Sequence, residues 1–304
     1  MTIISSETRR PFVPALTVVE APAVEPDGLV PPHGGVLVDR FVSDDELPLF
    51  VAYAEKLPSI ALDGREQADL ELIATGAASP LTGYLGSADY ESVLERLRLA
   101  DDTIWPLPLT LAIDEATREQ LAVGAEAALR GHDGRLLGVL LVEELFTRDP
   151  LVEANAVYGT IDESHPGVAY LLARPRTLAA GPVLALPLPP TIPFAEHRYA
   201  PFELRQEIRR RGWSTVAGFQ TRNPIHRAHE HLTKVALEQV DGLVIHPLVG
   251  ETKGDDVPAA VRMETYKVLL EHYYPRDRAM LAVMPAHMRY GGPREAVLHA
   301  IVRR

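Results

Sequence analysis

The second half of the chain alternates short apolar runs with amphipathic stretches, which predicts strands alternating with helices. Ala228, Leu232, Val235 and Ala236 share one face of the first such helix. Strand–helix repeats of this kind imply right-handed connections and a parallel sheet, which binds ligands beyond the carboxyl ends of its strands. The predicted strands are residues 215–219, 243–249 and 279–284, and the predicted helices are residues 224–240, 257–272 and 293–304.

The first half has a different pattern, which is mixed and mostly β. Apolar residues alternate with others along residues 106–114, which predicts a strand. Residues 127–130 and 135–142 are joined by Gly131-His132-Asp133-Gly134, which predicts a hairpin. A short helix is predicted to start at Ser87. Its apolar face would consist of Tyr90, Val93, Leu94 and Leu97.

Proline clusters predict where these two parts begin and end. Residues 21–35 contain four prolines and are interpreted as an extended N-terminal arm. Residues 182–193 contain five, which neither a helix nor a central strand would tolerate, so we interpret them as a linker. We therefore predict two domains, residues 1–190 with the arm and residues 191–304. Three strands form a small sheet for a stable domain, so we expect the second domain to be incomplete at its C-terminus.

Composition excludes several classes of protein. The chain of 304 residues contains no Cys, which excludes disulfides, thiol nucleophiles and thiolate zinc sites and agrees with a reducing cytoplasm, where we expect the protein. The longest apolar run, residues 136–142, is far shorter than the roughly 20 residues of a membrane span. We therefore expect no membrane partner.

Charge is distributed unevenly along the chain, whose net charge is −12. Residues 196–304 hold 17 Lys and Arg against 13 Asp and Glu, a net charge of +4, and 8 of the 11 His. Residues 1–195 hold 13 against 29, a net charge of −16. The second half therefore suits a small anionic ligand, whereas the acidic first half argues against nucleic acid as a partner.

The candidate site is the segment 218–230, at the carboxyl end of the first predicted parallel strand. Asn223 is a favoured N-cap and Pro224 suits the first helical position, so we expect the helix to begin here. His226 and His229 then lie on one helix face near the positive end of the helix dipole. Free backbone N–H groups at such a helix start bind phosphate.

Gln220 and Arg222 add a second group of donors beside this helix start. They are two positions apart in extended chain, so we expect both side chains to leave on the same side. An amide and a guanidinium that converge in this way form a pocket for a tetrahedral oxyanion. Two anions could therefore bind side by side. A His pair alone does not complete a tetrahedral metal site, so we predict no metal ligands in the protein.

The sequence Gln220-Thr221-Arg222-Asn223-Pro224, followed by His226 and His229, resembles the signature of the ATP sulfurylase (sulfate adenylyltransferase) family, which belongs to the HIGH-type nucleotidylyltransferase superfamily. The resemblance extends over most of the chain. Motifs similar to the family's N-terminal PUA-like β domain are Pro32-His33-Gly34-Gly35, Ser79-Pro80-Leu81-Thr82-Gly83-Tyr84 and Trp105-Pro106-Leu107-Pro108. Motifs similar to its catalytic domain are Lys253-Gly254-Asp255-Asp256 and Met288-Arg289-Tyr290-Gly291-Gly292-Pro293-Arg294-Glu295.

The resemblance implies a mixed, mostly β PUA-like domain followed by a Rossmann-like parallel α/β domain. It implies that sulfate attacks the α-phosphorus of MgATP in line, giving adenosine 5′-phosphosulfate and pyrophosphate. The implied catalytic residues are Thr221, Arg222, Asn223, His226 and His229, and the implied ATP- and sulfate-binding residues are Gln220, Thr221, Arg222 and Asn223.

These residues have separate implied roles. Arg222 and Gln220 would hold sulfate, and His226 and His229 would stabilise charge on the α-phosphate and the departing pyrophosphate. Mg²⁺ would arrive on the pyrophosphate oxygens of ATP rather than in a protein cage. The partners implied are the small molecules ATP and sulfate and, as is common in the family, further copies of the chain in a homo-oligomer.

One departure from the family pattern leaves alternatives open. The family continues into another strand and a Gly-Arg-Asp-His-Ala-Gly loop that closes over the nucleotide, and this sequence has no such motif. We therefore expect either a fragment of a longer enzyme or a natural short form. The rival functions are a related nucleotidylyltransferase with a phosphorylated or carboxylated substrate, and a non-enzymatic subunit or regulatory fragment that binds nucleotide or sulfate. Lys253, Arg289 and Arg294 are further candidates for phosphate contacts, with a loop position or surface salt bridges as alternatives.

Overall fold

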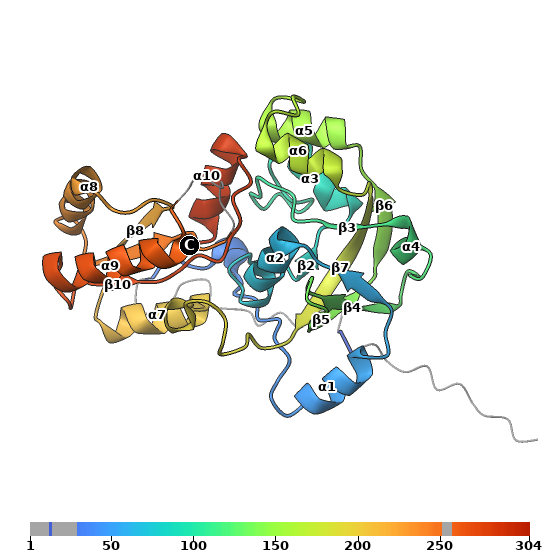
Figure 1. The fold of residues 1–304 in the computed structure, drawn as a ribbon, viewed down its shortest axis with the longest axis horizontal. Coiled ribbons are helices and arrows are strands. Elements are labelled where there is room, and N and C mark those ends of the chain that lie inside the picture. The colour runs from blue at the N-terminus through green and yellow to red at the C-terminus, as the bar shows by residue number, and fades with distance from the viewer. Residues whose placement is uncertain (1–11, 14–28, 251–256) are drawn as a thin grey trace, which may run out of the picture.

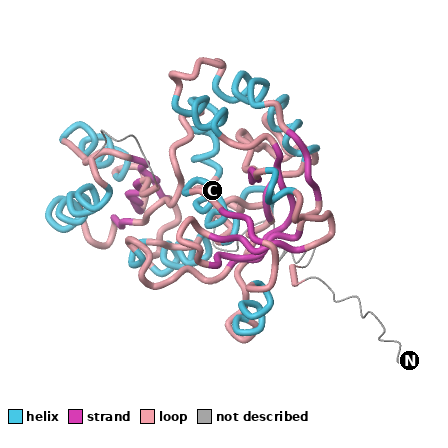
Figure 2. The backbone as a smooth tube through the Cα atoms, turned by 45° about the vertical axis from the view of Figure 1, so that its right-hand side comes forward, coloured by secondary structure: helices cyan, strands magenta, loops and turns pink. Residues whose placement is uncertain are grey.

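The chain folds into two parts, each built around its own β-sheet (Figure 1). The structure is a computed structural model and describes residues 12–13, 29–250 and 257–304. Within these residues, a seven-stranded sheet lies in the first half of the sequence and a three-stranded sheet in the second. Figure 2 shows them as two separate groups of strands. The predicted fold class, a mixed β-sheet domain followed by a parallel α/β domain, is confirmed.

The first sheet has the strand order β1-β4-β5-β7-β2, and β3 and β6 also pair with β7. Its strands are β1 (Ser59–Ala61), β2 (Gly83–Tyr84), β3 (Leu111–Ile113), β4 (Glu126–Arg130), β5 (Leu136–Leu141), β6 (Glu144–Thr147) and β7 (Thr177–Ala185). The predicted hairpin is confirmed as the antiparallel pair β4 and β5. The strand predicted over residues 106–114 is shorter, because Pro106 and Pro108 lack the N–H groups of a ladder. Leu107 and Leu109 are nevertheless buried.

Helices pack around this sheet, and the sequence pattern predicted only one of them. They are α1 (Leu47–Ala54), α2 (Gly64–Ala74), α3 (Ser87–Arg96), α4 (Glu115–Arg118), α5 (Pro150–Tyr158) and α6 (Pro166–Ala173), with the 3-10 helix η1 (His33–Gly35) before them. The predicted helix is α3, which starts at Ser87 as predicted and has Gly86 as its N-cap. Its Tyr90 and Val93 are buried as expected. Of the predicted N-terminal arm, residues 21–28 lie outside the described residues.

Strand β7 corrects the predicted linker, because it includes Pro182 and leaves the sheet only after Ala185. The strand changes partners along its length, pairing first with β3 and β6 and then with β2 and β5. Pro182 faces Gly83 of β2, and the adjacent ladder bond runs from the Val183 N–H to the Thr82 carbonyl at 2.9 Å. Since N–H groups alternate sides along a strand, β2 needs no donor from residue 182, and a proline is tolerated there.

The second sheet has the order β10-β9-β8, and its strands are parallel, as the strand–helix repeat predicts. Its strands are β8 (Val216–Thr221), β9 (Gly242–Pro247) and β10 (Ala279–Leu281). Its helices are α7 (Pro201–Arg210), α8 (Arg227–Leu237), α9 (Ala259–Tyr273) and α10 (Gly292–Ile301), with the 3-10 helix η2 (Ala195–His197) ahead of α7. The carboxyl end of β8 therefore leads directly into α8, which is the connection that carries the candidate site.

Helices cover both faces of this sheet. On one face the core contains Leu243 and Ile245 of β9 together with residues of α8 and α9. On the other face it contains Val244 of β9 together with residues of α7. Because side chains alternate along a strand, Phe219 of β8 faces α8, whereas Gln220 faces the opposite side, where α10 also lies.

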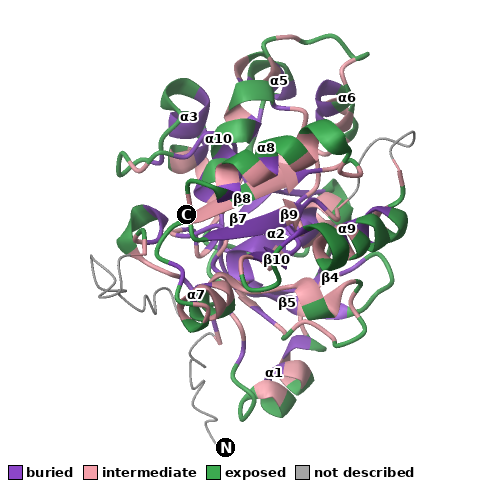
Figure 3. Cartoon of the chain, turned by 90° about the vertical axis from the view of Figure 1, so that its left-hand side faces the viewer, coloured by how far each residue is buried: buried purple, intermediate pink, exposed green. Residues whose placement is uncertain are grey.

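The buried face of α8 is not the one that the apolar pattern predicts. Leu232 and Val235 are 59% and 44% exposed, and Figure 3 shows the outward side of α8 as exposed. The side of α8 that faces the core runs instead through the buried Thr233 and Leu237, with the half-buried His229 four residues before Thr233. Thr233 is accommodated because its hydroxyl bonds the carbonyl of His229 at 2.9 Å. A hydroxyl that satisfies its own helix can face the core, which periodicity of apolar residues does not register.

Helix α10 joins the two halves of the molecule. In Figure 1 it stands between the parallel sheet and the helices of the first half. Its Leu298 and Ile301 belong to the same buried core as Trp105 and Leu107 of the first half. No helix in the described ranges is long and apolar enough to cross a membrane.

Candidate active site

The turn that follows β8 is held by the side chain of Thr221, which is 8% exposed. Its hydroxyl accepts a hydrogen bond from the Asn223 N–H at 3.0 Å and donates to the Asn223 carbonyl at 2.9 Å. The Tyr266 hydroxyl of α9 donates to the same carbonyl at 2.7 Å. Strand β8 ends here, so the chain turns away from the sheet edge at a fixed point.

Helix α8 begins three residues later than predicted, at Arg227. Its N-cap is His226, whose Nδ1 accepts a hydrogen bond from the Ala228 N–H at 3.3 Å. The prediction that Asn223 caps the helix is therefore wrong. Asn223 is already part of the turn closed by Thr221, and an imidazole nitrogen supplies the acceptor that a helix start requires.

The two histidines of the predicted pair lie together at this helix start. The ring centroids of His226 and His229 are 3.9 Å apart, and the His229 ring also contacts Phe219 of β8 at 5.7 Å. The Nδ1 atom of His229 is buried and has no hydrogen-bond partner in the part of the chain that the structure describes. A buried imidazole nitrogen without a partner is available to a ligand, since burying it unsatisfied costs free energy.

Gln220 has a partner that the sequence did not predict. Its Nε2 lies 2.8 Å from Nδ1 of His299 on α10. We expected the side chains of Gln220 and Arg222 to leave the strand on the same side, which requires the chain to stay extended as far as Arg222. Because β8 ends at Thr221, that alternation stops short of Arg222, which is half-buried in the bend. Asn223 follows it and is exposed.

Arg289 and Arg294 hold the two halves together instead of facing a phosphate site. Arg289 forms a buried ion pair with Asp69 of α2. Arg294 donates to the carbonyls of Val93, Leu94 and Pro106 at 3.0–3.2 Å. Neither forms a surface salt bridge with a residue that the structure describes, which was the alternative that the sequence left open. The motif Lys253-Gly254-Asp255-Asp256, with its candidate Lys253, lies outside the described residues.

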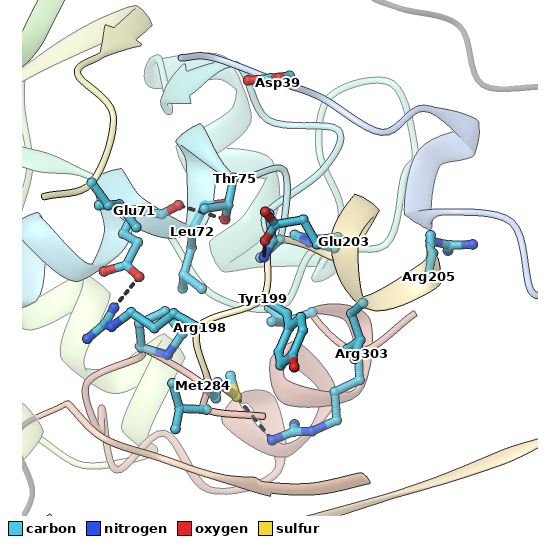
Figure 4. Close-up of a pocket in the computed structure, with 18 of the residues that line it drawn as sticks. Asp39, Glu71, Leu72, Thr75, Arg198, Tyr199, Glu203, Arg205, Met284 and Arg303 are labelled. Atoms are coloured by element: carbon cyan, nitrogen blue, oxygen red, sulfur yellow. Dashed lines mark hydrogen bonds and ion pairs between the residues drawn. The ribbon is translucent and has the colours of Figure 1, made fainter. Parts of the chain in front are cut away.

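A large cavity in the described part of the chain does not lie at the predicted site. Its volume is about 960 Å³, and it lies between α7 and the first half, on the sheet face opposite α8 (Figure 4). Gly218 and His246 line it, as does the buried ion pair of Arg198 with Glu71. No residue from 220 to 229 lines it. We therefore assign the candidate site to the segment after β8 because of the chemistry of its side chains, and not because of the size of a cavity.

Sequence reasoning missed two groups around the candidate site. Tyr266 supports the turn from α9, and His299 contacts Gln220 from α10. Both lie on helices that the sequence predicts, but pattern alone does not state which helix residue meets which strand. Within the described ranges, no group of three or more His, Asp or Glu side chains could hold a metal ion.

Two histidines on the far side of the sheet, the buried His299 and the half-buried His246, make stability depend on pH. Burial and the nearby guanidinium of Arg303 lower the pKa of His246 to about 3 and, with Arg289, lower the pKa of His299 to about 4. The unfolded chain binds these protons near pH 6.5. It therefore holds more protons than the folded chain below that pH, so the free energy of unfolding should fall as the pH decreases from about 6.5 to 4.

We expect the substitution His299→Asn to reduce this loss by about 1–3 kcal/mol at pH 4, because it removes one of the titrating groups. Urea unfolding of both proteins at intervals between pH 7 and pH 4 measures the effect. Equal losses in the wild type and the variant would contradict it.

Comparison with known proteins agrees with this arrangement. Residues 30–187 match the PUA-like domain family, and residues 195–304 match the ATP-sulfurylase family. The chain is 54% identical over 275 residues to a sulfate adenylyltransferase of Symbiobacterium thermophilum, which covers 90% of this chain and 70% of that protein. It is 51% identical, over the same shares, to a sulfate adenylyltransferase of a Synechococcus species.

Longer proteins also contain a region similar to this chain. A probable bifunctional SAT/APS kinase 2 of Sorangium cellulosum is 46% identical over 91% of this chain and 48% of its own length. Among solved structures, a hexameric APS kinase from Thiobacillus denitrificans matches with a TM-score of 0.73 and 30% identity, over 90% of this chain and 50% of that one. The resemblance that the motif at Gln220 indicated is confirmed over nine-tenths of the sequence, and the chain belongs to the ATP-sulfurylase family.

Proposed function

We propose that this chain transfers AMP from MgATP to sulfate. A sulfate oxygen forms a bond to the α-phosphorus, the bond from that phosphorus to the bridging oxygen of the β-phosphate breaks, and pyrophosphate leaves with that electron pair. The products are adenosine 5′-phosphosulfate and pyrophosphate. Sulfate is a weak nucleophile and the reactants are both anions, so positioning and charge neutralisation are what the protein must supply.

The segment after β8 offers groups for both tasks. Arg222 and the Gln220 amide would hold sulfate, since a guanidinium presents paired donors to an oxyanion. His226 and His229, at the positive end of α8, would stabilise charge on the α-phosphate and the departing pyrophosphate. Thr221 would maintain the turn, because its hydroxyl is used there, and the exposed side chain of Asn223 would orient the nucleotide.

The observation that carries this proposal is the pair of rings at the start of α8. His226 and His229 are 3.9 Å apart, and Nδ1 of His229 is buried without a partner among the described residues. Such a pair beside a helix N-terminus, following an Arg and a Gln, suits the neutralisation of adjacent anions.

Release of pyrophosphate from MgATP by the purified chain tests the function directly. We expect release that depends on sulfate, and formation of ATP from adenosine 5′-phosphosulfate and pyrophosphate in reverse. Release that depends on a phosphorylated or carboxylated compound, and not on sulfate, would indicate the rival nucleotidylyltransferase. A rise in melting temperature with ATP or sulfate, but without pyrophosphate release, would indicate a binding subunit.

The substitution His226→Ala should lower kcat by about 10–100-fold with a small change in KM, as expected for a group that acts mainly in the transition state. The measurement is the steady-state rate of pyrophosphate release. His231→Ala is the matched control, since His231 is exposed one turn further along α8, and its kcat should equal that of the wild type.

A second variant separates charge stabilisation from helix capping. His226 is the N-cap of α8, and loss of a cap costs about 1 kcal/mol of stability. His226→Asn keeps a capping side chain but lacks the imidazole, so its kcat should stay low while its melting temperature recovers. Full recovery of kcat in His226→Asn would contradict the proposed role.

The remaining expectations concern the conditions of the reaction. We propose that Mg²⁺ is bound as part of the substrate MgATP, because its chemistry favours phosphate oxygens and retained water. We also expect the chain to act in the cytoplasm and to form homo-oligomers.

A further inference from the structure

A buried histidine on α10 contacts the candidate site from the side opposite α8. Nδ1 of His299 lies 2.8 Å from Nε2 of Gln220, and His299 is 5% exposed. Gln220 is the last residue but one of β8, directly before the turn held by Thr221. His299 therefore contacts a residue proposed to hold sulfate, without itself belonging to the motif.

The His299 ring is held in place by neighbours on its own helix. Glu295, one turn earlier, lies 3.7 Å from its Nε2 and is 6% exposed at the side chain. Glu295 is fixed in turn, because its carboxylate accepts hydrogen bonds from the N–H groups of Arg289 and Gly291 at 2.7 and 3.1 Å. Arg303, which follows α10, donates to the backbone carbonyl of His299 at 2.5 Å.

These contacts favour one position for the proton on the His299 ring. Assignment of a tautomer rests on the hydrogen-bond network. The carboxylate of Glu295 favours a proton on Nε2, so that Nδ1 is the acceptor and the Gln220 amide donates. Burial and the charges of Arg303 and Arg289 lower the pKa of His299 to about 4, so the ring remains a neutral acceptor at neutral pH. His246 of β9 faces the same region, and its pKa of about 3 keeps its ring neutral at neutral pH, so it adds no charge beside His299.

We propose that His299 is a positioning residue for sulfate, whose Nδ1 fixes the Gln220 amide in the orientation that presents its second N–H to the oxyanion. This inference rests on the proposed function. A side-chain amide carries two N–H donors on its nitrogen, and its acceptor, the carbonyl oxygen, lies on the opposite side of the group. Without His299, the amide of Gln220 could rotate and offer its carbonyl oxygen to sulfate, which would repel the anion.

Substitution of His299 by Phe tests this role, because it keeps a buried ring and removes the acceptor. Loss of one hydrogen bond of this kind is expected to raise the KM for sulfate by about 5–10-fold, with the KM for ATP within about twofold of the wild type. His299→Asn should return the KM for sulfate to near the wild-type value, since its side-chain oxygen can accept at the position of Nδ1. Ile301→Val, at a buried position of α10 away from Gln220, is the packing control.

The same substitution in a Gln220→Leu background distinguishes positioning from general packing. If His299 acts through Gln220, then His299→Phe should change the KM for sulfate by less than about twofold there, because the coupled partner is absent. An equal increase in both backgrounds, or an equal increase in the KM for ATP, would overturn the positioning role.

A nuclear magnetic resonance experiment reads the contact without any turnover. In the full chain with ¹⁵N-labelled histidine, the His299 signal, assigned by its loss in His299→Phe, should show an unprotonated Nδ1 and a protonated Nε2 at pH 7. The Nδ1 shift should move in Gln220→Leu. A proton on Nδ1 would overturn the inference. If the wild type lacks sulfate-dependent turnover, the proposed function fails, whereas the spectrum still decides whether His299 accepts from Gln220.

Discussion

Replacement of Arg222 by Ala is expected to lower kcat/KM for sulfate by about 10²–10³-fold, the effect typical of removing a charged donor from a reacting anion. The guanidinium would neutralise sulfate and orient it with paired hydrogen bonds. Initial rates of pyrophosphate release at saturating MgATP and varied sulfate measure the effect. Arg222→Lys, which keeps the charge but loses the planar pair of donors, should recover only part of the activity.

The control for this variant is an arginine of the same domain outside the site. Arg210 of α7 pairs with Glu207 at the surface and has a side chain that is 69% exposed, so Arg210→Ala should leave turnover unchanged. The free energy of unfolding of Arg222→Ala should change far less than its turnover. Wild-type turnover in Arg222→Ala would remove Arg222 from the proposed mechanism.

Replacement of Asp69 by Ala is expected to lower the free energy of unfolding by about 3–5 kcal/mol, because it leaves a buried cation without its partner. The side chains of Asp69 and Arg289 are 5% and 12% exposed, and they join α2 to the segment before α10. The two tryptophans of the chain report on the two halves separately, since Trp105 and Trp213 are buried in different cores. Urea unfolding of single-tryptophan variants would therefore show whether the halves unfold together.

A double variant distinguishes loss of a pair from loss of packing. Asp69→Ala combined with Arg289→Met removes both charges, and it should recover most of the stability that Asp69→Ala alone loses. Arg210→Ala at the exposed pair with Glu207 should cost less than about 1 kcal/mol. If Asp69→Ala is as stable as the wild type, the ion pair does not hold the two halves together.

The parts of the fold that depend on local pattern could be predicted from the sequence. Apolar runs alternating with amphipathic stretches predicted that β8, β9 and β10 form a parallel sheet. The Gly131-His132-Asp133-Gly134 turn predicted the hairpin of β4 and β5. Both depend on periodicity or on turn chemistry, which are properties of neighbouring residues.

The parts of the fold that depend on tertiary contacts could not be predicted from the sequence. Pro182 lies inside β7 at the point where the strand changes partners. Thr233 of α8 can face the core because its hydroxyl is bonded within the helix, while Leu232 and Val235 lie on the outward face. His226, not Asn223, caps α8, since the turn at Thr221 already uses Asn223. Each outcome depends on a hydrogen bond or a strand pairing that propensity does not encode.

In the candidate site, too, the features set by local sequence could be predicted and the tertiary contacts could not. The motif at residues 220–229 identified the segment, its position after β8 and its two histidines from residue types and spacing alone. The contact between Gln220 and His299 spans 79 positions of sequence, and the pair of Asp69 with Arg289 joins the two halves. Without an alignment or a structure, no spacing rule connects such residues.

The most direct test is a crystal structure of the chain with sulfate and a non-hydrolysable analogue of MgATP. Sulfate should lie within hydrogen-bond distance of Arg222 and the Gln220 amide, with the α-phosphate beside His226 and His229 and in line with a sulfate oxygen. Both ligands bound away from residues 220–229, with Arg222 and His226 packed against protein, would contradict the account.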